Sequence, residues 1–285
     1  MLVPCMTSKL SFLPIVLLSV SLLGAVSVIA EETTDVISGQ FSLAVGIGRY
    51  TSPQVDSDNL PIYLLPRWSY YCDRFYVEDL DLGFNLIETE LFSWDITTKQ
   101  SFDALMFHQG SLKDSLLAGF ASSGIPLALP WGAEVDDMFN PTKRHMSYLG
   151  GTTMFFRAGN WKFKTAYHTD ISNVHGGSEW ASDLRYLTQI QSVDVAATVG
   201  VRRLDRQYSN YYFGLSEEDT DGVLINTPGA QWLPSLKLEL SWAIRPDLRA
   251  IGSWRREWLA DEYQQSYFID SNTHDIWFIG VMKTW

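Results

Sequence analysis

The segment from Leu236 to Ile244 alternates strictly between apolar residues and polar or small ones. Successive side chains of a β-strand point to opposite faces, whereas a helix repeats every 3.6 residues, so a period of two predicts a strand with one apolar face. The short connection Arg245-Pro246-Asp247 follows, and the alternation then resumes from Leu248 to Trp254. The sequence therefore predicts a β-hairpin, and the whole fold has to accommodate strands with two unlike faces.

The first thirty residues have the composition of an export signal. Lys9 is the only charge before Glu31, and the stretch from Leu10 to Ala30 is almost wholly apolar or small. A basic start, an apolar run and a small residue at the cleavage point define a secretory signal peptide. Residues 1–30 are therefore predicted to be removed on export, with an N-terminal anchor helix as the alternative. Residues 31–285 are predicted to form one domain.

Two architectures fit an exported chain built from alternating strands. In a soluble β-sandwich the apolar faces point inward and the polar faces meet water. In an outer-membrane barrel the apolar faces meet lipid and the polar faces line the interior. Alternation alone does not separate the two.

Three further features favour the barrel. Aromatic residues stand near predicted strand ends, where a membrane barrel carries its girdles: Tyr70, Trp161, Trp242, Trp254, Trp258 and Trp277. Short connections such as Gly159-Asn160 alternate with long polar ones such as Gln207 to Gln231 and Ala260 to Asn272. The predicted last strand ends on the aromatic residue Trp285, which resembles the signal read by the barrel-assembly machinery of Gram-negative bacteria. We therefore predict an all-β, antiparallel, up-and-down transmembrane barrel.

The number of strands follows from length. Eleven segments read as strands, beginning near Phe41, Pro61, Phe75, Leu91, Tyr148, Trp161, Trp180, Val193, Leu233, Leu248 and Thr273. Strands of ~10 residues with connections of similar average length give about 12 strands for residues 31–285. Single-chain bacterial barrels have an even number of strands. Either a twelfth strand lies within His108 to His145, or one of the eleven segments does not span the membrane and about 10 strands do.

The stretch from His108 to His145 shows no clear alternation and contains two Pro-bearing segments. Long connections without secondary structure of their own are usually functional or disordered. We interpret residues 108–145 as a lid, a plug or an assembly loop.

Composition excludes other classes of protein. The chain has 21 Lys and Arg against 33 Asp and Glu, a net charge of −12, and phosphate contacts need a cationic surface, so nucleic acid is not an expected partner. A mean hydropathy of −0.04 excludes a bundle of membrane-spanning helices. It does not exclude a barrel, because a barrel turns every second residue towards its interior.

Some outer-membrane barrels are enzymes, so the histidines matter. The most suggestive group is His168-Thr169-Asp170 with Ser172 and His175, because a hydrolase needs a nucleophile beside a base that a carboxylate orients. However, His168 and Asp170 fall on the same inward face near a loop, as is typical of a solvated barrel rim. His175 and His274 could be metal ligands on neighbouring loops, but no Cys or paired-His spacing supports this. We expect no catalytic, cofactor-binding or metal-ligating residues.

The predicted inward faces carry charges of both signs. They comprise Asp79, Asp81, Asp95, Lys162, Lys164, Asp183, Arg185, Asp194, Arg202, Lys237, Glu239, Arg249, Arg255 and Glu257. Mixed signs favour mutual pairing, whereas a selective pore tends to show one dominant sign at its constriction. We therefore predict a largely occluded lumen.

Several motifs then resemble one family. They are Gly48-Arg49-Tyr50 with Ser57-Asp58 and Leu60-Pro61-Ile62-Tyr63-Leu64-Leu65-Pro66; Arg74-Phe75 with Leu82-Gly83-Phe84-Asn85-Leu86; His168 to Gly177; and Asn210-Tyr211-Tyr212-Phe213-Gly214 with Glu217-Glu218. Together with the layout of the closing hairpin, they are similar to the MltA-interacting protein (MipA/OmpV) family of Gram-negative outer-membrane proteins. Ser266-Tyr267-Phe268-Ile269 and the terminal Met282-Lys283-Thr284-Trp285 depart from the family pattern.

The resemblance implies a barrel in the outer membrane, in contact with lipid and lipopolysaccharide, and no catalytic residue. It implies a non-enzymatic scaffold that binds a lytic transglycosylase and a penicillin-binding synthase near the cell wall. Other members of the family are described as surface antigens, adhesins or porin-like proteins. The alternatives are therefore a channel for small solutes, a surface adhesin or antigen and, from another class, an outer-membrane hydrolase.

Overall fold

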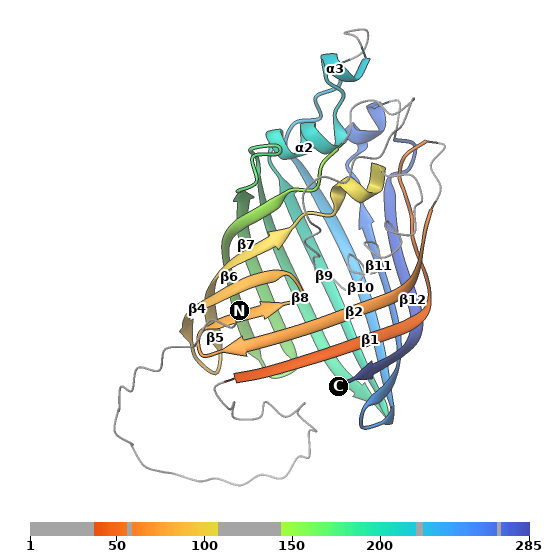
Figure 1. The fold of residues 1–285 in the computed structure, drawn as a ribbon. Helices are drawn as coiled ribbons and strands as arrows, with labels where there is room; N and C mark the ends of the chain where they lie inside the picture. Colours follow the sequence, from red (N-terminus) through yellow and green to blue (C-terminus); the bar gives the residue numbers. More distant parts are fainter. Residues whose placement is uncertain (1–36, 56–58, 108–143, 221–224, 267–268) are drawn as a thin grey trace, which may run out of the picture.

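The computed structural model describes residues 37–55, 59–107, 144–220, 225–266 and 269–285. They form a closed antiparallel barrel in which each strand pairs with its neighbours in sequence and β1 pairs with β12 (Figure 1). The strands are β1 (Ile37–Tyr50), β2 (Leu60–Cys72), β3 (Phe75–Glu78), β4 (Asp81–Glu88), β5 (Phe92–Gln100), β6 (Tyr148–Ala158), β7 (Trp161–Asp170), β8 (Ser178–Ile190), β9 (Val193–Leu204), β10 (Gln231–Arg245), β11 (Leu248–Trp258) and β12 (Thr273–Thr284). The predicted barrel fold is confirmed.

Four short helical elements lie in the described parts of the connections. They are η1 (Asp103–Phe107), α2 (Arg206–Phe213), α3 (Glu217–Thr220) and η2 (Asp261–Gln265). No helix among the described residues is both long and apolar enough to cross a membrane.

The barrel closes where the two ends of the described chain meet. The backbone N–H of Trp285 donates to the carbonyl of Phe41 at 2.8 Å, and the N–H of Phe41 donates back at 3.5 Å. The two rings lie 5.6 Å apart, and the Lys283 ammonium lies 5.1 Å from the centre of the Trp285 ring. The terminal tryptophan therefore fixes the last strand against the first, and Lys283 packs on it instead of facing lipid alone.

The barrel has the twelve strands predicted from length, but the twelfth comes from neither of the two alternatives that the sequence left open. The segment beginning at Phe75 contains two strands, β3 and β4, separated by a turn in which Asp79 has a positive φ of 54°. No Gly or Pro marks this turn, and Asp is one of the few residues that adopt this conformation, so the two strands read as one. Residues 108–143, the main part of the predicted lid or plug, lie outside the described residues.

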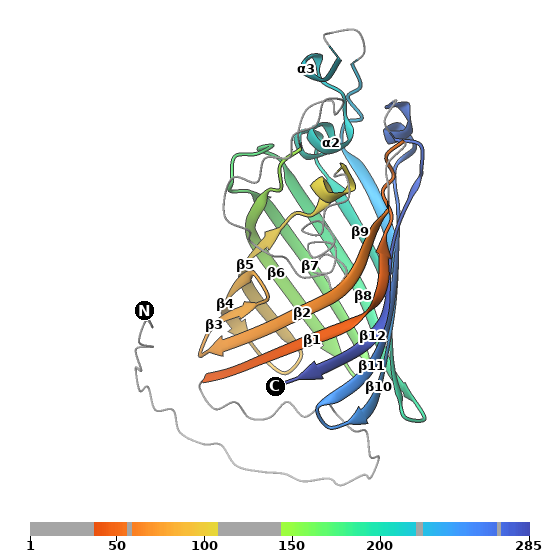
Figure 2. The same ribbon diagram turned by 45° about the vertical axis from the view of Figure 1, so that its right-hand side comes forward.

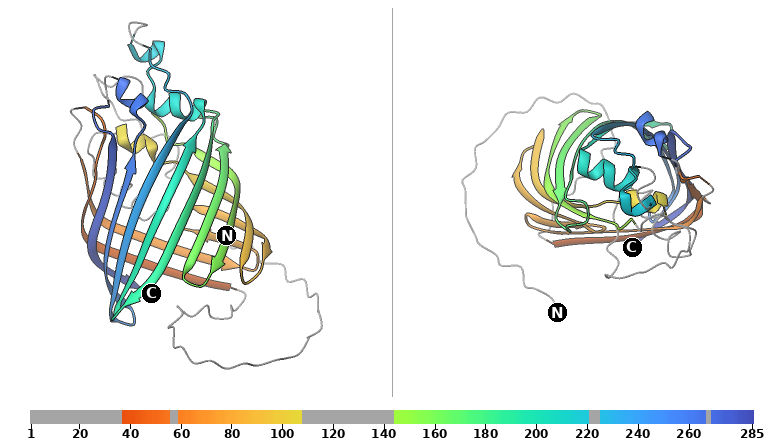
Figure 3. Two further views of the ribbon diagram at one scale, coloured as in Figure 1. Left: turned by 180° about the vertical axis from the view of Figure 1, so that it is seen from behind. Right: turned by 90° about the horizontal axis from the view of Figure 1, so that it is seen from above.

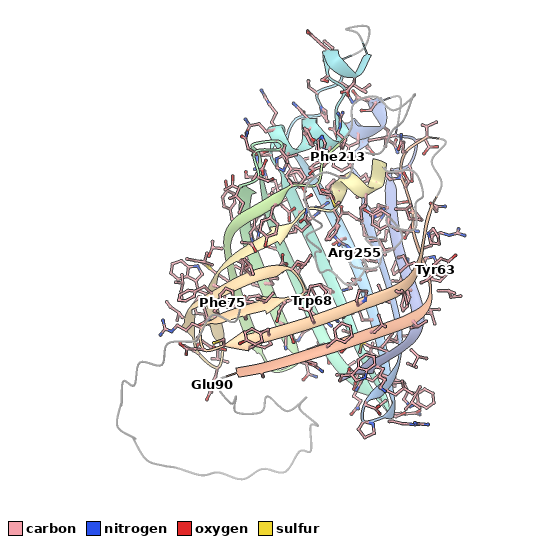
Figure 4. All side chains as sticks on the ribbon, viewed as in Figure 1. Tyr63, Trp68, Phe75, Glu90, Phe213 and Arg255 are labelled. Carbon is pink, nitrogen blue, oxygen red and sulfur yellow. The ribbon has the colours of Figure 1, made fainter. Side chains whose placement is uncertain are left out.

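The faces of the strands follow the predicted alternation. On β7, Trp161, Phe163 and Tyr167 point outward and are 48%, 38% and 52% exposed, while Ala166 and His168 point inward and are buried. Tyr63 and Phe75 likewise lie on the outside of the barrel, whereas Arg255 lies within its outline (Figure 4). An exposed apolar exterior around a polar interior is the arrangement of a membrane barrel.

The two ends of the barrel differ. One end, here called the turn end, carries the short connections 73–74, 89–91, 159–160, 191–192 and 246–247 (Figure 2). Asp73, Gly159 and Gln191 have positive φ there, as tight hairpin turns require. The other end, here called the loop end, carries 51–59, 101–147, 171–177, 205–230 and 259–272. In outer-membrane barrels short turns face the periplasm and long loops face the medium.

Side chains from the loops and the upper strands form one apolar core at the loop end, and α2 lies over the mouth of the barrel (Figure 3). Its fully buried large members are Tyr50, Leu60, Ile62, Leu105, Met106, Leu149, Tyr208, Tyr212, Phe213, Tyr263 and Phe278. Phe213 on α2 stacks on Tyr263 on η2, with the ring planes 4° apart and the centroids 4.1 Å apart. The described residues therefore pack across the loop-end mouth.

Candidate functional site

Arg202 lies at the centre of a charged cluster directly beneath this core. The alternation of β9 turns its side chain inward, where Nη1 lies 3.2 Å from a carboxylate oxygen of Asp103 and 3.2 Å from one of Glu179. Nη2 lies 2.6 Å from Glu257, whose second oxygen accepts from Nε at 3.1 Å. One guanidinium thus joins β8, β9, β11 and η1.

Further groups complete this cluster, which we call the Arg202 cluster. Lys99 on β5 pairs with Glu179, and Arg255 on β11 donates to Glu257 at 2.7 Å. The hydroxyl of Tyr208 on α2 donates to Asp103 at 2.9 Å. Three cations therefore face three carboxylates. Taking charges out of water is costly unless they are paired and hydrogen-bonded, and here each carboxylate has at least two partners.

A small cavity of about 100 Å³ borders the Arg202 cluster. Its lining includes Lys99, Asp103, Arg202, Glu257 and His274. This volume suits a few water molecules, which need polar partners of this kind. It does not suit a sugar or a peptide.

Helix α2 covers the Arg202 cluster, and we call this helix the cap. Its sequence explains why the helix forms. The Asp205 carboxylate accepts from the N–H of Tyr208 at 2.9 Å, which satisfies a free donor of the first turn. Tyr208 and Tyr212, four residues apart, fall on one face and are fully buried. Burial, with the negative charge of Asp103 nearby, raises the pKa of Tyr208 well above its ordinary value. The tyrosine is therefore a neutral hydrogen-bond donor.

The group around His168 and Asp170 does not assemble into a hydrolase site. Nε2 of His168 lies 2.9 Å from the hydroxyl of Thr97. Asp170 accepts from the Ser172 hydroxyl at 2.7 Å and from the backbone N–H groups of Ser172, Val174, His175 and Gly176 at 2.7–2.9 Å. The carboxylate therefore organises the 171–177 loop, and its partners are loop amides instead of a catalytic base.

The side chain of His175 is buried and has a structural role. Its Nδ1 accepts from the N–H of Gly177 at 2.9 Å, so Nε2 carries the proton and donates to the Ser147 hydroxyl at 3.0 Å. The ring packs 4.4 Å from that of Tyr208 and 5.6 Å from that of Tyr212. Burial lowers the pKa of His175, although neighbouring carboxylates oppose the shift. The imidazole is therefore neutral near pH 7.

His274 does not share a site with His175. It lies on β12, where Nδ1 contacts the carbonyl of Thr51 at 2.6 Å and the ring packs 4.3 Å from that of Tyr50. In the described part of the chain, no three His, Cys, Asp or Glu side chains are arranged to hold a metal ion.

A second group of charges lies in the half of the lumen nearer the turn end. Arg157 on β6 stands opposite Lys162 on β7, which in turn stands opposite Arg185 on β8. All three point inward, and we call them the cationic row. Lys162 is exposed, as is Lys164 on the same face of β7. Within the described ranges, no carboxylate lies within ion-pairing distance of Arg157, Lys162 or Lys164.

The structure places the predicted lumen charges largely as expected. Arg202, Glu257 and Arg255 meet in one cluster, Arg185 and Lys237 pair with Glu239 at 2.9 and 3.1 Å, and Arg249 pairs with Asp194. Asp79 differs because it lies in a turn, where it accepts from the N–H of Trp68 at 2.7 Å.

Sequence reasoning missed four members of the site. Lys99 lies near the end of β5 and Glu179 near the start of β8, and neither was among the predicted inward charges. Asp103 lies on a helical turn after β5. Tyr208 lies in a connection that read as a polar loop. The signal that marks α2 is Asp205 followed by aromatic residues at a spacing of four.

Comparison with known proteins agrees with this architecture. Residues 45–285 match the family described as MltA-interacting protein MipA. YiaT of Escherichia coli O157:H7, whose name describes it as an outer membrane protein, is 24% identical over 246 residues, or 84% of this chain and 89% of YiaT. YiaT of Escherichia coli strain K12 is 23% identical over 245 residues, with the same coverage.

Among solved structures, a NanC porin aligns with 86% of this chain and 99% of its own length at 7% identity. The TM-score of this alignment is 0.39. The match to the family model spans most of the chain and agrees with the closed twelve-stranded barrel. The chain is therefore an outer-membrane protein that belongs to the MltA-interacting protein MipA family.

Proposed function

We propose that this protein is a non-enzymatic scaffold of the outer membrane that binds cell-wall enzymes at its periplasmic face. Its partners would be a lytic transglycosylase and a penicillin-binding synthase, and its barrel wall contacts lipid and lipopolysaccharide. Residues 1–30 act as the export signal, and residues 31–285 form the barrel domain. The family description, which names MltA as a partner, supports this proposal.

The observation that carries the proposal is the packing of the loop-end mouth. The apolar core and the Arg202 cluster join nine strands with η1, α2 and η2, and the charges of the cluster are paired with one another. Such an arrangement favours a rigid platform over a wide pore. The histidines that could have served a hydrolase are each bound to structural partners, which favours binding over catalysis.

Affinity capture from solubilised envelopes tests the scaffold role. The short turns face the periplasm, so a charge reversal there, Asp247→Lys, should reduce recovery of the murein enzymes. The matched reversal at the loop end, Asp261→Lys, should leave recovery unchanged, because that end faces the medium. Both side chains are exposed, so neither reversal should disturb the fold. If neither enzyme is enriched with the wild-type barrel, or if both variants behave alike, the scaffold role is wrong.

A channel for small solutes is the second candidate, and one observation favours it. The cationic row and Lys164 leave exposed charges in the periplasmic half of the lumen, where water has access. A conducting pore should give reproducible single-channel steps in planar bilayers and swelling of liposomes. A tightly packed loop end should give neither, so this measurement separates the two functions.

A further inference from the structure

The cationic row presents an electrostatic problem that the described residues do not solve. Residues directly opposite each other on paired strands have Cβ atoms ~5 Å apart, and like charges at that spacing destabilise a sheet. Arg157, Lys162 and Arg185 occupy three such positions in succession on β6, β7 and β8. Three adjacent cations are unexpected in a chain whose net charge is −12.

The carboxylates nearby do not neutralise the row. Glu239 pairs with Arg185 at 2.9 Å, but it is shared with Lys237 at 3.1 Å and lies within electrostatic reach of Arg67 on β2. Asp183 stands opposite Lys164, the next inward residue of β7. Arg157 and Lys162 are left without a partner among the described residues.

An independent observation concerns Arg185 itself. Its Nε atom is buried and has no hydrogen-bond partner within the described ranges, although its terminal nitrogen is paired with Glu239. A buried donor without an acceptor costs free energy comparable to a lost hydrogen bond. An anion seated along the row would supply acceptors to Arg185 and countercharge to Lys162 at once.

The position of the row determines where such an anion would come from. Arg157 and Lys162 flank the Gly159-Asn160 turn, so they lie at the periplasmic mouth of the lumen. Trp161 and Tyr186 form an outward-facing aromatic pair at the same level, with ring centroids 4.7 Å apart. Aromatic side chains of this kind mark the membrane interface.

We propose that the cationic row, together with Lys164, is a binding site for a periplasmic oligoanion. The ligand carries two or more carboxylate or phosphate groups spaced ~5 Å apart, which matches the separation of neighbouring strands. Arg157 and Arg185 provide forked donors for such groups, and Lys162 and Lys164 provide point charges. This site does not depend on the scaffold role, because a barrel of either function would contain it.

Isothermal titration of the full mature protein in octyl glucoside micelles tests the proposal. Tripolyphosphate and citrate serve as the phosphate and carboxylate probes, and glucose serves as a neutral control. At low ionic strength the wild type should bind at least one of the two anions, and the affinity should fall as NaCl is raised. The stronger of the two responses identifies the preferred group.

Lys162→Ala should weaken binding by about tenfold, and Lys162→Ala with Lys164→Ala should abolish it. The matched control is Arg203→Ala, which removes a cation from the outer face of β9, where Arg203 lies 5.9 Å from the Trp232 ring. Folding of every variant is checked by its heat-modifiable mobility on electrophoresis. The site is disproved if the wild type binds neither anion, or if Arg203→Ala weakens binding as much as Lys162→Ala does.

Discussion

The two halves of the lumen belong to one closed barrel, but their charged side chains are arranged differently. At the loop end, the side chains of Glu179 and Glu257 are 0% and 2% exposed, and the charges of both signs are paired. At the turn end, Lys162 and Lys164 are exposed and have no ion pair among the described residues. The strand alternation supplies polar groups to both halves, so the wall does not cause the difference.

The loops cause it. Long connections place Asp103 on η1 against Arg202 and Tyr208 on α2 against Asp103. They add a third carboxylate and a cover to Glu179 and Glu257 of the strands. The turn end has only short turns, so its inward cations depend on carboxylates of the strands. Arg249 pairs with Asp194 and Arg185 pairs with Glu239, whereas Lys162 and Lys164 have no ion pair among the described residues. The comparison indicates that the loop end is built for stability and that the turn end is available for binding.

The strongest test of this contrast is Arg202→Ala. It leaves the carboxylates of Asp103, Glu179 and Glu257 close together without their shared cation. Breaking a buried ion pair by removing one partner costs about 3–5 kcal/mol. Urea unfolding in detergent, followed by tryptophan fluorescence, should show a loss of this size.

Arg203→Ala is the matched control for that experiment, because the adjacent side chain points out of the barrel. It should change the free energy of unfolding by about 0.5 kcal/mol or less. Equal losses from the two variants would show that the Arg202 cluster is not the stabilising feature of the loop end.

Tyr208→Phe tests whether the cap and the cluster act together. The phenol joins α2 to Asp103 at 2.9 Å and to Ser101 at 2.5 Å, and its removal leaves a buried carboxylate with one donor fewer. The expected cost is about 1–3 kcal/mol. In a double-mutant cycle with Arg202→Ala the two losses should not add, since both variants disturb the same carboxylate. Additive losses would mean that α2 and the Arg202 cluster stabilise the barrel independently of each other.

The sequence predicted the wall of the barrel well because alternation is a local property. Each of the eleven segments that we identified contains a strand, and the apolar faces point outward. The error at Asp79 was local as well: two short strands joined by a turn without Gly or Pro have the same pattern as one long strand.

The candidate site was predicted only in part, because its contacts are not local. Arg202 and Asp103 are separated by 99 residues in sequence, and their meeting depends on closure of the barrel and on where η1 is placed. Inward faces could be read from the sequence, but the pairing partners across the lumen could not. The cationic row was missed for the same reason, since the register of β6, β7 and β8 is needed to see that its members are adjacent.

The pH dependence of stability should also separate the two halves. Burial lowers the folded-state pKa of His175 below the value near 6.5 of an unfolded chain. Between these two pKa values the unfolded state binds a proton that the folded state does not. Stability from this residue is therefore complete above about pH 6.5 and is lost as the pH falls below it, at about 1.4 kcal/mol per pH unit or less.

His175→Gln should reduce this slope, and the measurement is the difference between the two unfolding curves from pH 7.5 to 5. The control is Lys162→Gln, which alters the turn end and should leave the slope unchanged. An identical pH dependence in wild type and His175→Gln would mean that the buried imidazole does not titrate on unfolding.

The variant Lys162→Gln should raise the stability of the barrel slightly, whereas the other variants lower it. It tests the difference between the loop end and the turn end most directly. Without a ligand, Lys162→Gln removes a charge that faces Arg157 and Arg185 across two strand pairs. Relief of this repulsion should stabilise the barrel by a few tenths of a kcal/mol, about the size of a cross-strand pair. The gain should shrink as salt screens the charges, and in excess tripolyphosphate the wild type should become the more stable of the two. A loss of stability without ligand would mean that Lys162 has a structural role, and the turn end would then resemble the loop end.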